Sequence, residues 1–161
     1  MLKGGEFLIK GQAVDTVFIP EQYDDEQKMI ADMCKEFMET QIDPNLDRID
    51  KLEDGLMESL VKEAGNLGLL GTGLPEEYGG FNKDEITLML QTEVLGGGHS
   101  FAVAYAAHTG IGTLPIFYYG TEGQKNKYLP QLASGEWIGA YCLTEPDSGS
   151  DARATTKQDV L

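Results

Sequence analysis

The sequence has 161 residues, of which 41% are hydrophobic and 24% charged, with a formal net charge of -15 at pH 7. This length and composition predict one folded domain with a sizeable core and exclude a disordered chain. The chain has 27 acidic and 12 basic residues. Because phosphate backbones and anionic lipid surfaces would repel such an acidic chain, we expect no nucleic-acid or membrane-surface binding.

The first half of the chain predicts an extended arm followed by two helices. Residues 1–22 lack a sustained hydrophobic period and form the arm. A helix is expected to start near Asp24, because Asp24 and Gln27 have the spacing of a capping box. A second helix is expected over about 54–66, and the glycine-rich stretch 68–81 predicts a loop. Apolar residues at helical spacing mark the buried face of the first helix: Ile30, Met33, Cys34 and Phe37.

Three further helices are expected before residue 137. Asn82 and Glu85 predict the cap of the third helix, and Thr121 and Gln124 predict the cap of the fifth. Between them, residues 101–116 form a largely apolar run without a charged residue. Such a run predicts a helix that is buried on most sides, in the centre of a bundle.

The character of the sequence changes after residue 136. Residues 137–143 are apolar and aromatic, and 145–149 have turn composition, so we expect a buried strand that ends in a turn. A lone strand is not stable, because its backbone groups need partner strands. The sequence therefore predicts an all-α fold: a bundle of about five helices over 23–136, followed by the first strand of a truncated β domain over 137–161.

The histidines and cysteines favour packing over metal chemistry. His99 and His108 lie nine residues apart, without a neighbouring cluster of metal ligands, so we expect helix-end or packing roles and no metal site. Cys34 and Cys142 are too far apart in sequence to form a disulfide framework, which indicates a reducing compartment. Cys142 is expected to be a small buried hydrophobe. No window approaches the roughly 20 apolar residues of a membrane helix.

The turn after the expected strand allows two interpretations. Its backbone N–H groups, with the hydroxyls of Thr144, Ser148 and Ser150, could bind one acceptor-rich ligand such as a phosphate or the carbonyl edge of a flavin. Alternatively, its Ser and Asp side chains cap their own backbone in a solvated turn, which is the commoner use of these residues. The residues themselves leave both open.

Longer motifs add a resemblance to the acyl-CoA dehydrogenase family. The run 140–151, AYCLTEPDSGSD, resembles the first signature of that family. Three upstream stretches are similar to the family and follow its order: 67–71, 74–80 and 120–130. The stretch 108–115 is similar to the branch that handles longer fatty acyl chains.

The resemblance implies a fold of an α domain, a β domain and a second α domain, with FAD as the cofactor. It implies that Tyr141, Leu143 and Thr144 lie against the flavin, the last two bonding its pyrimidine edge. Gly149 and Ser150 would lie at the cofactor pyrophosphate, with Ser150 also near the acyl-CoA substrate. The implied reaction is α,β-dehydrogenation of a fatty acyl-CoA, after which an electron-transfer flavoprotein reoxidises the cofactor.

The same resemblance places the catalytic glutamate beyond residue 161, so we assign no catalytic residue here. We expect the isolated chain to be inactive and to bind little FAD, and the full-length protein to be a homodimer or homotetramer. Glu93 has two interpretations: an exposed or paired residue near a helix end, or part of a helix along the acyl channel. In the second, Gly97 would leave room for a longer acyl chain.

Two rival functions remain open at this point. The chain could be a stand-alone helical interaction module, or a family member recruited for complex assembly with little dehydrogenase activity. The reading frame after the codon for Leu161 discriminates between a module and an enzyme domain. We expect a cytoplasmic location, or the mitochondrial matrix if a transit peptide was removed.

Overall fold

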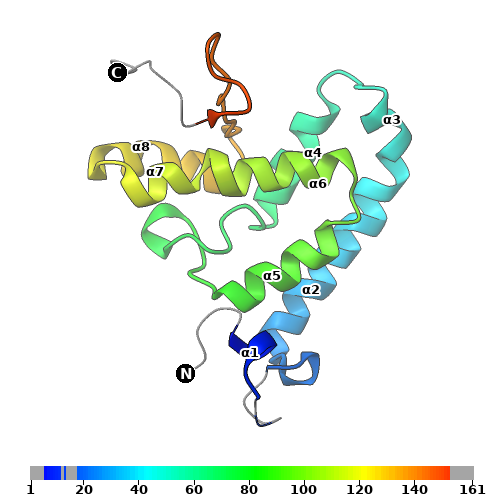
Figure 1. Cartoon of the computed structure of the whole chain (residues 1–161). Coiled ribbons are helices and arrows are strands. Elements are labelled where there is room, and N and C mark those ends of the chain that lie inside the picture. Colours follow the sequence, from blue (N-terminus) through cyan, green and yellow to red (C-terminus); the bar gives the residue numbers. More distant parts are fainter. Residues whose placement is uncertain (1–5, 12, 14–17, 153–161) are drawn as a thin grey trace.

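The computed structural model describes residues 6–11, 13 and 18–152, which form a helical bundle with an extended segment at its carboxyl end (Figure 1). The α-helices, in chain order, are α1 (Glu6–Ile9), α2 (Asp25–Phe37), α3 (Leu46–Asp50), α4 (Leu56–Asn66), α5 (Glu85–Leu95), α6 (Ser100–Ala106), α7 (Leu114–Tyr119) and α8 (Glu122–Ala133). Two π-helical segments, Met38–Ile42 and Ala107–Gly112, follow α2 and α6. The all-α prediction is confirmed for the described residues.

Short polar caps begin three of the longer helices. The Asp24 carboxylate accepts from the N–H of Gln27 at 2.7 Å, and the Gln27 side chain accepts from the N–H of Asp24, so the predicted capping box is confirmed. Thr121 and Gln124 form the second predicted box. The third predicted cap is wrong, because Asp84 rather than Asn82 caps α5.

The shift of the α5 cap has a local cause. The Asp84 carboxylate accepts both the N–H and the hydroxyl of Thr87, at 2.9 and 2.7 Å. Asn82 instead has a positive φ of 49°, and its N–H donates to the carbonyl of Leu74 at 2.8 Å. Asn82 therefore closes the loop after α4, and the helix begins two residues later than a cap at Asn82 would allow.

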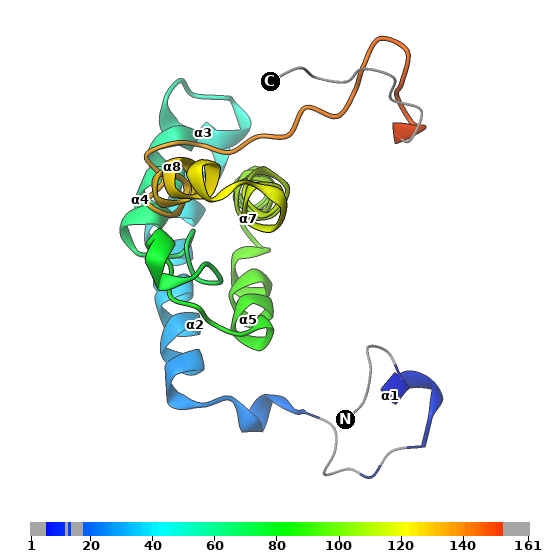
Figure 2. The same ribbon diagram turned by 90° about the vertical axis from the view of Figure 1, so that its left-hand side faces the viewer.

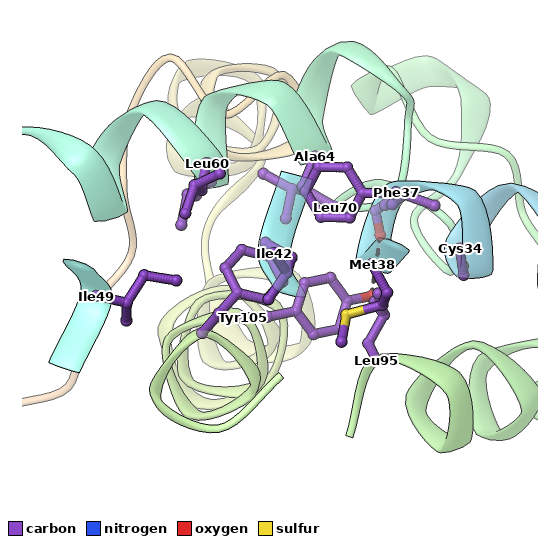
Figure 3. Close-up of a cluster of buried hydrophobic side chains, with 13 residues drawn as sticks. Cys34, Phe37, Met38, Ile42, Ile49, Leu60, Ala64, Leu70, Leu95 and Tyr105 are labelled. Carbon is purple, nitrogen blue, oxygen red and sulfur yellow. Dashed lines mark hydrogen bonds between the residues drawn. The ribbon is translucent and has the colours of Figure 1, made fainter. Parts of the chain in front are cut away.

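The predicted face of α2 lies in the main core, between α2, α4 and α6 (Figure 3). Cys34 and Phe37 are fully buried, and the Phe37 ring packs on Phe101 with 5.6 Å between centroids. Ile30 and Met33 pack at the edge of this core. Burial raises the pKa of the Cys34 thiol to about 12, because a thiolate would lose its hydration there.

The stretch 68–81 is a loop, as predicted, interrupted by one 3-10 turn at Glu76–Tyr78. Its glycines allow close backbone contacts. A Cβ on Gly80 would lie only 2.0 Å from the carbonyl oxygen of Leu74, and Gly68 adopts a φ of +80°. The loop thus folds tightly against itself between α4 and α5.

The prediction of one helix over 101–116, buried on most sides, is wrong. The run divides into α6, the π segment Ala107–Gly112 and α7. Phe101 and Tyr105 face the core, whereas Val103 is 71% and Ile111 52% exposed. The described part of the chain packs against one side of this run and leaves the other side uncovered.

The predicted strand over 137–143 does not form among the described residues. The segment leaves the bundle after α8 and projects from it (Figure 2). Its bulky residues are about half exposed, and Cys142 is exposed rather than buried as expected. A strand needs a neighbouring strand to bond with, and the described residues offer this segment none. Within it only the N–H groups of Trp137 and Gly139 are bonded, and the isolated bridge from Glu145 to Ser148 lies beyond it.

The ends of the chain are described only in part. Of the predicted arm over 1–22, the described residues include the single turn α1 and the 3-10 turn Pro20–Gln22. Residues 153–161 of the predicted β domain lie outside the described residues. No helix within the described residues is long and apolar enough to cross a membrane.

Candidate functional site

The candidate site is the segment 137–151, which starts where α8 ends. Gly135 reverses the chain with a φ of +68°, a conformation that favours glycine. The N–H of Trp137 then donates to the carbonyl of Gln131 at 3.0 Å, and its ring packs on Tyr128 with 5.8 Å between centroids. These contacts fix the direction in which the segment leaves the helix.

His108 makes the next contact with this segment. Its imidazole is fully buried, with Nε2 2.9 Å from the carbonyl oxygen of Leu132 and Nδ1 accepting from the N–H of Gly139 at 3.0 Å. Burial lowers the pKa of His108, and the hydrogen bond to Leu132 opposes that shift. The packing role predicted for His108 is confirmed, and His99 is the residue before α6, a helix-end position.

The residues predicted to contact the flavin follow directly. Tyr141, Leu143 and Thr144 are exposed, at 51% for Tyr141 and 41% for Leu143. None of the hydrogen bonds within the described part of the chain involves residues 140–144. Their backbone N–H groups and the Thr144 hydroxyl are therefore available to a ligand or to another part of a larger protein.

The turn that follows is bonded to itself, through its backbone and through one side chain. Glu145 and Ser148 exchange two backbone hydrogen bonds, at 2.9 and 3.2 Å. The buried Ser148 hydroxyl donates to the carbonyl of Asp151 at 2.7 Å, so this serine caps its own turn. Gly149 and Ser150 follow this turn directly and are exposed.

The residues predicted to contact substrate on the helical side lie on a different element. Glu93 is exposed on the last turn of α5, and Gly97 is exposed two residues after that helix ends. A Cβ on Gly97 would meet only the terminal methyl of Met38, at 3.9 Å. The structure thus places Glu93 and Gly97 together near one helix end, and it places the five predicted flavin contacts together in one segment.

A cavity of about 230 Å³ between α5, α6–α7 and the loop before α5 had no counterpart in the sequence. Its lining is mostly apolar and includes Leu69, Leu88, Met89, Tyr105 and Phe117. Neither Glu93 nor Gly97 contributes to it. One signal could have indicated this cavity. Leu88, Met89 and Thr92 have the spacing of a single helix face, and the main core does not use that face of α5.

A buried polar group adjoins that cavity. Gln91 is fully buried, and its amide nitrogen donates to the carbonyl of Leu69 at 2.8 Å and to the hydroxyl of Tyr105 at 2.6 Å. Tyr105 also donates to the Leu69 carbonyl, at 3.0 Å. This triad joins α5 and α6 to the loop. In the described residues, no group of three or more His, Cys, Asp or Glu is placed to hold a metal ion.

Comparison with known proteins shows which family this chain resembles. The model of the acyl-CoA dehydrogenase N-terminal domain matches residues 24–136. A probable acyl-CoA dehydrogenase of Bacillus subtilis is 48% identical over 159 residues, which cover 99% of this chain and 27% of that relative. The chain thus spans about a quarter of the length of this relative.

Solved structures agree. An acyl-CoA dehydrogenase from Bacillus anthracis, complexed with FAD, superposes with a TM-score of 0.87 and 47% identity, over 94% of this chain and 27% of that one. A chain in the structure of the electron transferring flavoprotein of Acidaminococcus fermentans superposes with a TM-score of 0.76 and 35% identity, over 84% of this chain and 36% of that one. The chain therefore belongs to the acyl-CoA dehydrogenase family, with residues 24–136 as the N-terminal helical domain.

Proposed function

We propose that this chain is the N-terminal part of an FAD-dependent acyl-CoA dehydrogenase that catalyses α,β-dehydrogenation of fatty acyl-CoA. The observation that carries the proposal is the segment 140–144. It is anchored at its base, exposed along its length, and free of hydrogen bonds within the described chain. The relative from Bacillus anthracis, which shares this segment's family, was solved with FAD.

The residues of this segment fit a flavin. An isoalloxazine ring offers a flat apolar face and an edge of hydrogen-bond acceptors, and the segment presents apolar side chains together with unengaged N–H groups. Tyr141 and Leu143 would pack against the ring, while the N–H of Leu143 and the hydroxyl of Thr144 would donate to the pyrimidine edge. Donors there stabilise negative charge on a reduced flavin.

When bound, the flavin accepts the hydride that leaves the β carbon of the acyl chain. Gly149 and Ser150 would hold the cofactor pyrophosphate, because both are exposed in the bend that follows the turn and their backbone N–H groups could donate to phosphate oxygens. Ser150 would also lie near the acyl-CoA. The base that removes the α proton would be a glutamate outside these 161 residues, and we assign no catalytic residue within them.

The proposal also covers the electron acceptor, the length of the acyl chain, the oligomeric state and the location of the enzyme. An electron-transfer flavoprotein would reoxidise the cofactor, and the chain's likeness to a chain in the Acidaminococcus fermentans structure supports that partner. A longer acyl chain, as the stretch 108–115 predicts, would pass near Gly97. We also propose a homodimeric or homotetrameric full-length enzyme in the bacterial cytoplasm, a location supported by the Bacillus relative.

The reading frame beyond the codon for Leu161 tests the proposal most directly. We expect it to continue, and the full-length product to purify yellow and to reduce an artificial electron acceptor with a fatty acyl-CoA. The isolated 161-residue chain is the matched control, and we expect it to be colourless and inactive. A stop codon after Leu161, or a colourless full-length protein, would favour the helical interaction module instead.

Gly97 allows a separate test of chain-length preference. Because a Cβ there meets only a flexible Met38 methyl group, at 3.9 Å, the backbone leaves room for a side chain at this exposed position. We expect Gly97→Phe in the full-length enzyme to lower kcat/KM for long acyl-CoAs more than for medium ones. Gly123→Phe, at an exposed glycine of α8 with nothing within 4 Å of its Cβ position, serves as the control. An unchanged preference in Gly97→Phe would remove Gly97 from the acyl channel.

A further inference from the structure

Gly139 is held from two sides at the base of the candidate flavin-binding segment. On one side, its N–H donates to Nδ1 of His108 at 3.0 Å. On the other, its backbone lies directly against that of Gly112: a Cβ on Gly112 would be 2.8 Å from the carbonyl carbon of Gly139 and 3.0 Å from its Cα. A side chain on Gly112 would therefore force one of the two backbones to move, and a Cβ on Gly139 would lie a tight 3.2 Å from the backbone of Gly112.

The two residues that hold Gly139 come from one unusual element. His108 and Gly112 belong to the π-helical segment Ala107–Gly112, between α6 and α7. Such wide turns are rare in proteins and occur frequently at functional sites. The Thr113 hydroxyl donates to the carbonyl of His108 at 2.6 Å, so a side-chain hydrogen bond links the end of this segment to His108.

The partners of His108 determine its protonation state. A carbonyl oxygen can only accept, so Nε2 must carry the hydrogen that points at Leu132. A backbone N–H can only donate, so Nδ1 must present its lone pair to Gly139. The ring is therefore neutral and in one tautomer, and it joins three elements: its own π segment, the end of α8, and the segment that follows.

His108 provides the last intrachain hydrogen bond before the exposed residues. Beyond Gly139, none of the hydrogen bonds in the described part of the chain involves residues 140–144, and bonding resumes at Glu145. Tyr141 is two residues from Gly139, and two residues span at most about 7 Å. The position of Gly139 therefore limits where the candidate flavin-binding residues can lie.

We infer that His108 is a positioning residue for the flavin: by holding Gly139 against Gly112, it sets where the segment Tyr141–Thr144 meets the cofactor. This inference rests on the proposed function, since it assigns FAD to that segment. His108 would act through Gly139, because its own side chain is fully buried. Burial of the imidazole, which disfavours its protonated form, keeps the acceptor at Nδ1 available.

Two substitutions in the full-length protein separate the hydrogen bonds of His108. An asparagine oxygen can take the place of Nδ1, so His108→Asn keeps an acceptor for Gly139 and loses the bond to Leu132. A glutamine nitrogen can take the place of Nε2, so His108→Gln keeps the bond to Leu132 and loses the acceptor. The two variants are therefore matched in chemistry and opposite in the contact that they retain.

The readouts are FAD affinity, the visible spectrum of the bound flavin, and hydrogen exchange of peptides covering 137–144, measured by mass spectrometry. We expect His108→Gln to raise the Kd for FAD about tenfold, to shift the flavin absorption band, and to speed exchange in those peptides even without FAD. His108→Asn should stay close to the unmodified protein in all three. Ile49→Val, in the core on α3, controls for modest destabilisation and should leave the flavin readouts unchanged.

The outcomes separate this inference from the function on which it rests. A yellow unmodified protein whose His108→Gln variant binds FAD with unchanged affinity and spectrum would overturn the positioning role and leave the flavoenzyme intact. Equal effects of His108→Gln and His108→Asn on the flavin would also overturn it, because destabilisation alone would then explain them. A full-length protein that binds no FAD would overturn both proposals, while the exchange data would still report whether His108 holds Gly139.

Discussion

Two regions of this chain place the same kinds of side chain in opposite surroundings. In the core between α2, α4 and α6, Cys34 and Phe101 have no exposed surface. In the segment after α8, Cys142 is exposed and Leu143 is 41% exposed. Both stretches are apolar in sequence, so hydrophobicity alone does not decide which becomes buried.

The two regions differ in burial because they differ in the hydrogen-bond and packing partners that the described chain provides. A helix satisfies its own backbone groups and needs only an apolar neighbour to cover one face, and the bundle provides several such neighbours. The segment 137–144 needs backbone partners as well, and the described residues bond it only through Trp137 and Gly139, at its base. The helices of the core therefore find their backbone hydrogen bonds and their apolar neighbours within the described chain. The segment is anchored at one end, and its remaining backbone groups have no partner among the described residues.

Thiol labelling tests this contrast with the largest expected effect. Because burial raises the pKa of Cys34 to about 12, its thiolate fraction near pH 8 is on the order of 10³-fold below that of an ordinary thiol, and burial also blocks access. We expect iodoacetamide to modify the exposed Cys142 far faster than the buried Cys34, as measured by peptide mass spectrometry over time. In denaturant, the two rates should converge. Similar rates for Cys34 and Cys142 without denaturant would show that the core opens readily.

Core truncation should give the next largest effect. Phe101→Ala removes a buried ring that packs on Phe37 and Tyr105, and we expect it to lower the free energy of unfolding by about 3–5 kcal/mol. Trp137→Ala is the matched aromatic truncation in the segment, where the ring is 44% exposed, and its cost should be about 1 kcal/mol. Chemical denaturation of both variants measures the difference. Equal losses would show that the base of the segment is as much a part of the core as Phe101.

The sequence predicted the helical part of the fold well because its signals there are local. The capping boxes at Asp24 and Thr121, and the face of α2 with Cys34 and Phe37, depend on residues three or four positions apart. The cap of α5 was misplaced by two residues because Asp84 competed with Asn82 for the same role. Local patterns rank such neighbours poorly when both can cap a helix.

The sequence predicted which residues form the candidate site, but not the contacts that hold the site in place. The residues Tyr141 to Ser150, most of them exposed, were found through a motif of fixed spacing, and the role predicted for five of them at the flavin stays a prediction. The bond from His108 to Gly139 spans 31 residues, and the contact of Gly112 with Gly139 spans nearly as many. No periodicity joins such positions, because a three-dimensional fold brings them together. The uncovered side of α6 was missed for a related reason: an uncharged helix does not reveal how many neighbours it has.

Acid titration tests the link between the two regions through His108. Burial lowers its folded-state pKa below the ordinary value of 6.5, so the unfolded chain binds the proton more readily than the folded one. The contribution of His108 to stability is therefore fully present above about pH 6.5, and it is lost as the pH falls from there through the depressed folded-state pKa. We expect the free energy of unfolding to decrease over this range, before the carboxylates of Asp84 and Glu136, whose pKa values are lowered, lose their contributions at lower pH.

His108→Gln and His108→Asn supply the controls for this titration, because neither replacement can be protonated. Urea denaturation at a series of pH values between 7 and about 5 should show a smaller slope in both variants than in the unmodified chain. An identical slope in the unmodified chain and both variants would mean that the protonation of His108 does not limit stability.

The smallest expected effect is also the most discriminating one for the outward-facing segment. Leu143 is 41% exposed, and no hydrogen bond within the described residues involves it. Leu143→Ala should therefore change the free energy of unfolding of the 161-residue chain by less than about 0.5 kcal/mol, whereas Leu60→Ala, a buried leucine on α4, should cost about 2–5 kcal/mol. In the full-length protein, the same Leu143→Ala change should weaken FAD binding, because the side chain would then lose an apolar contact with the ring. A large loss of stability in the 161-residue chain would instead show that Leu143 serves the fold, and that the segment is not reserved for a ligand.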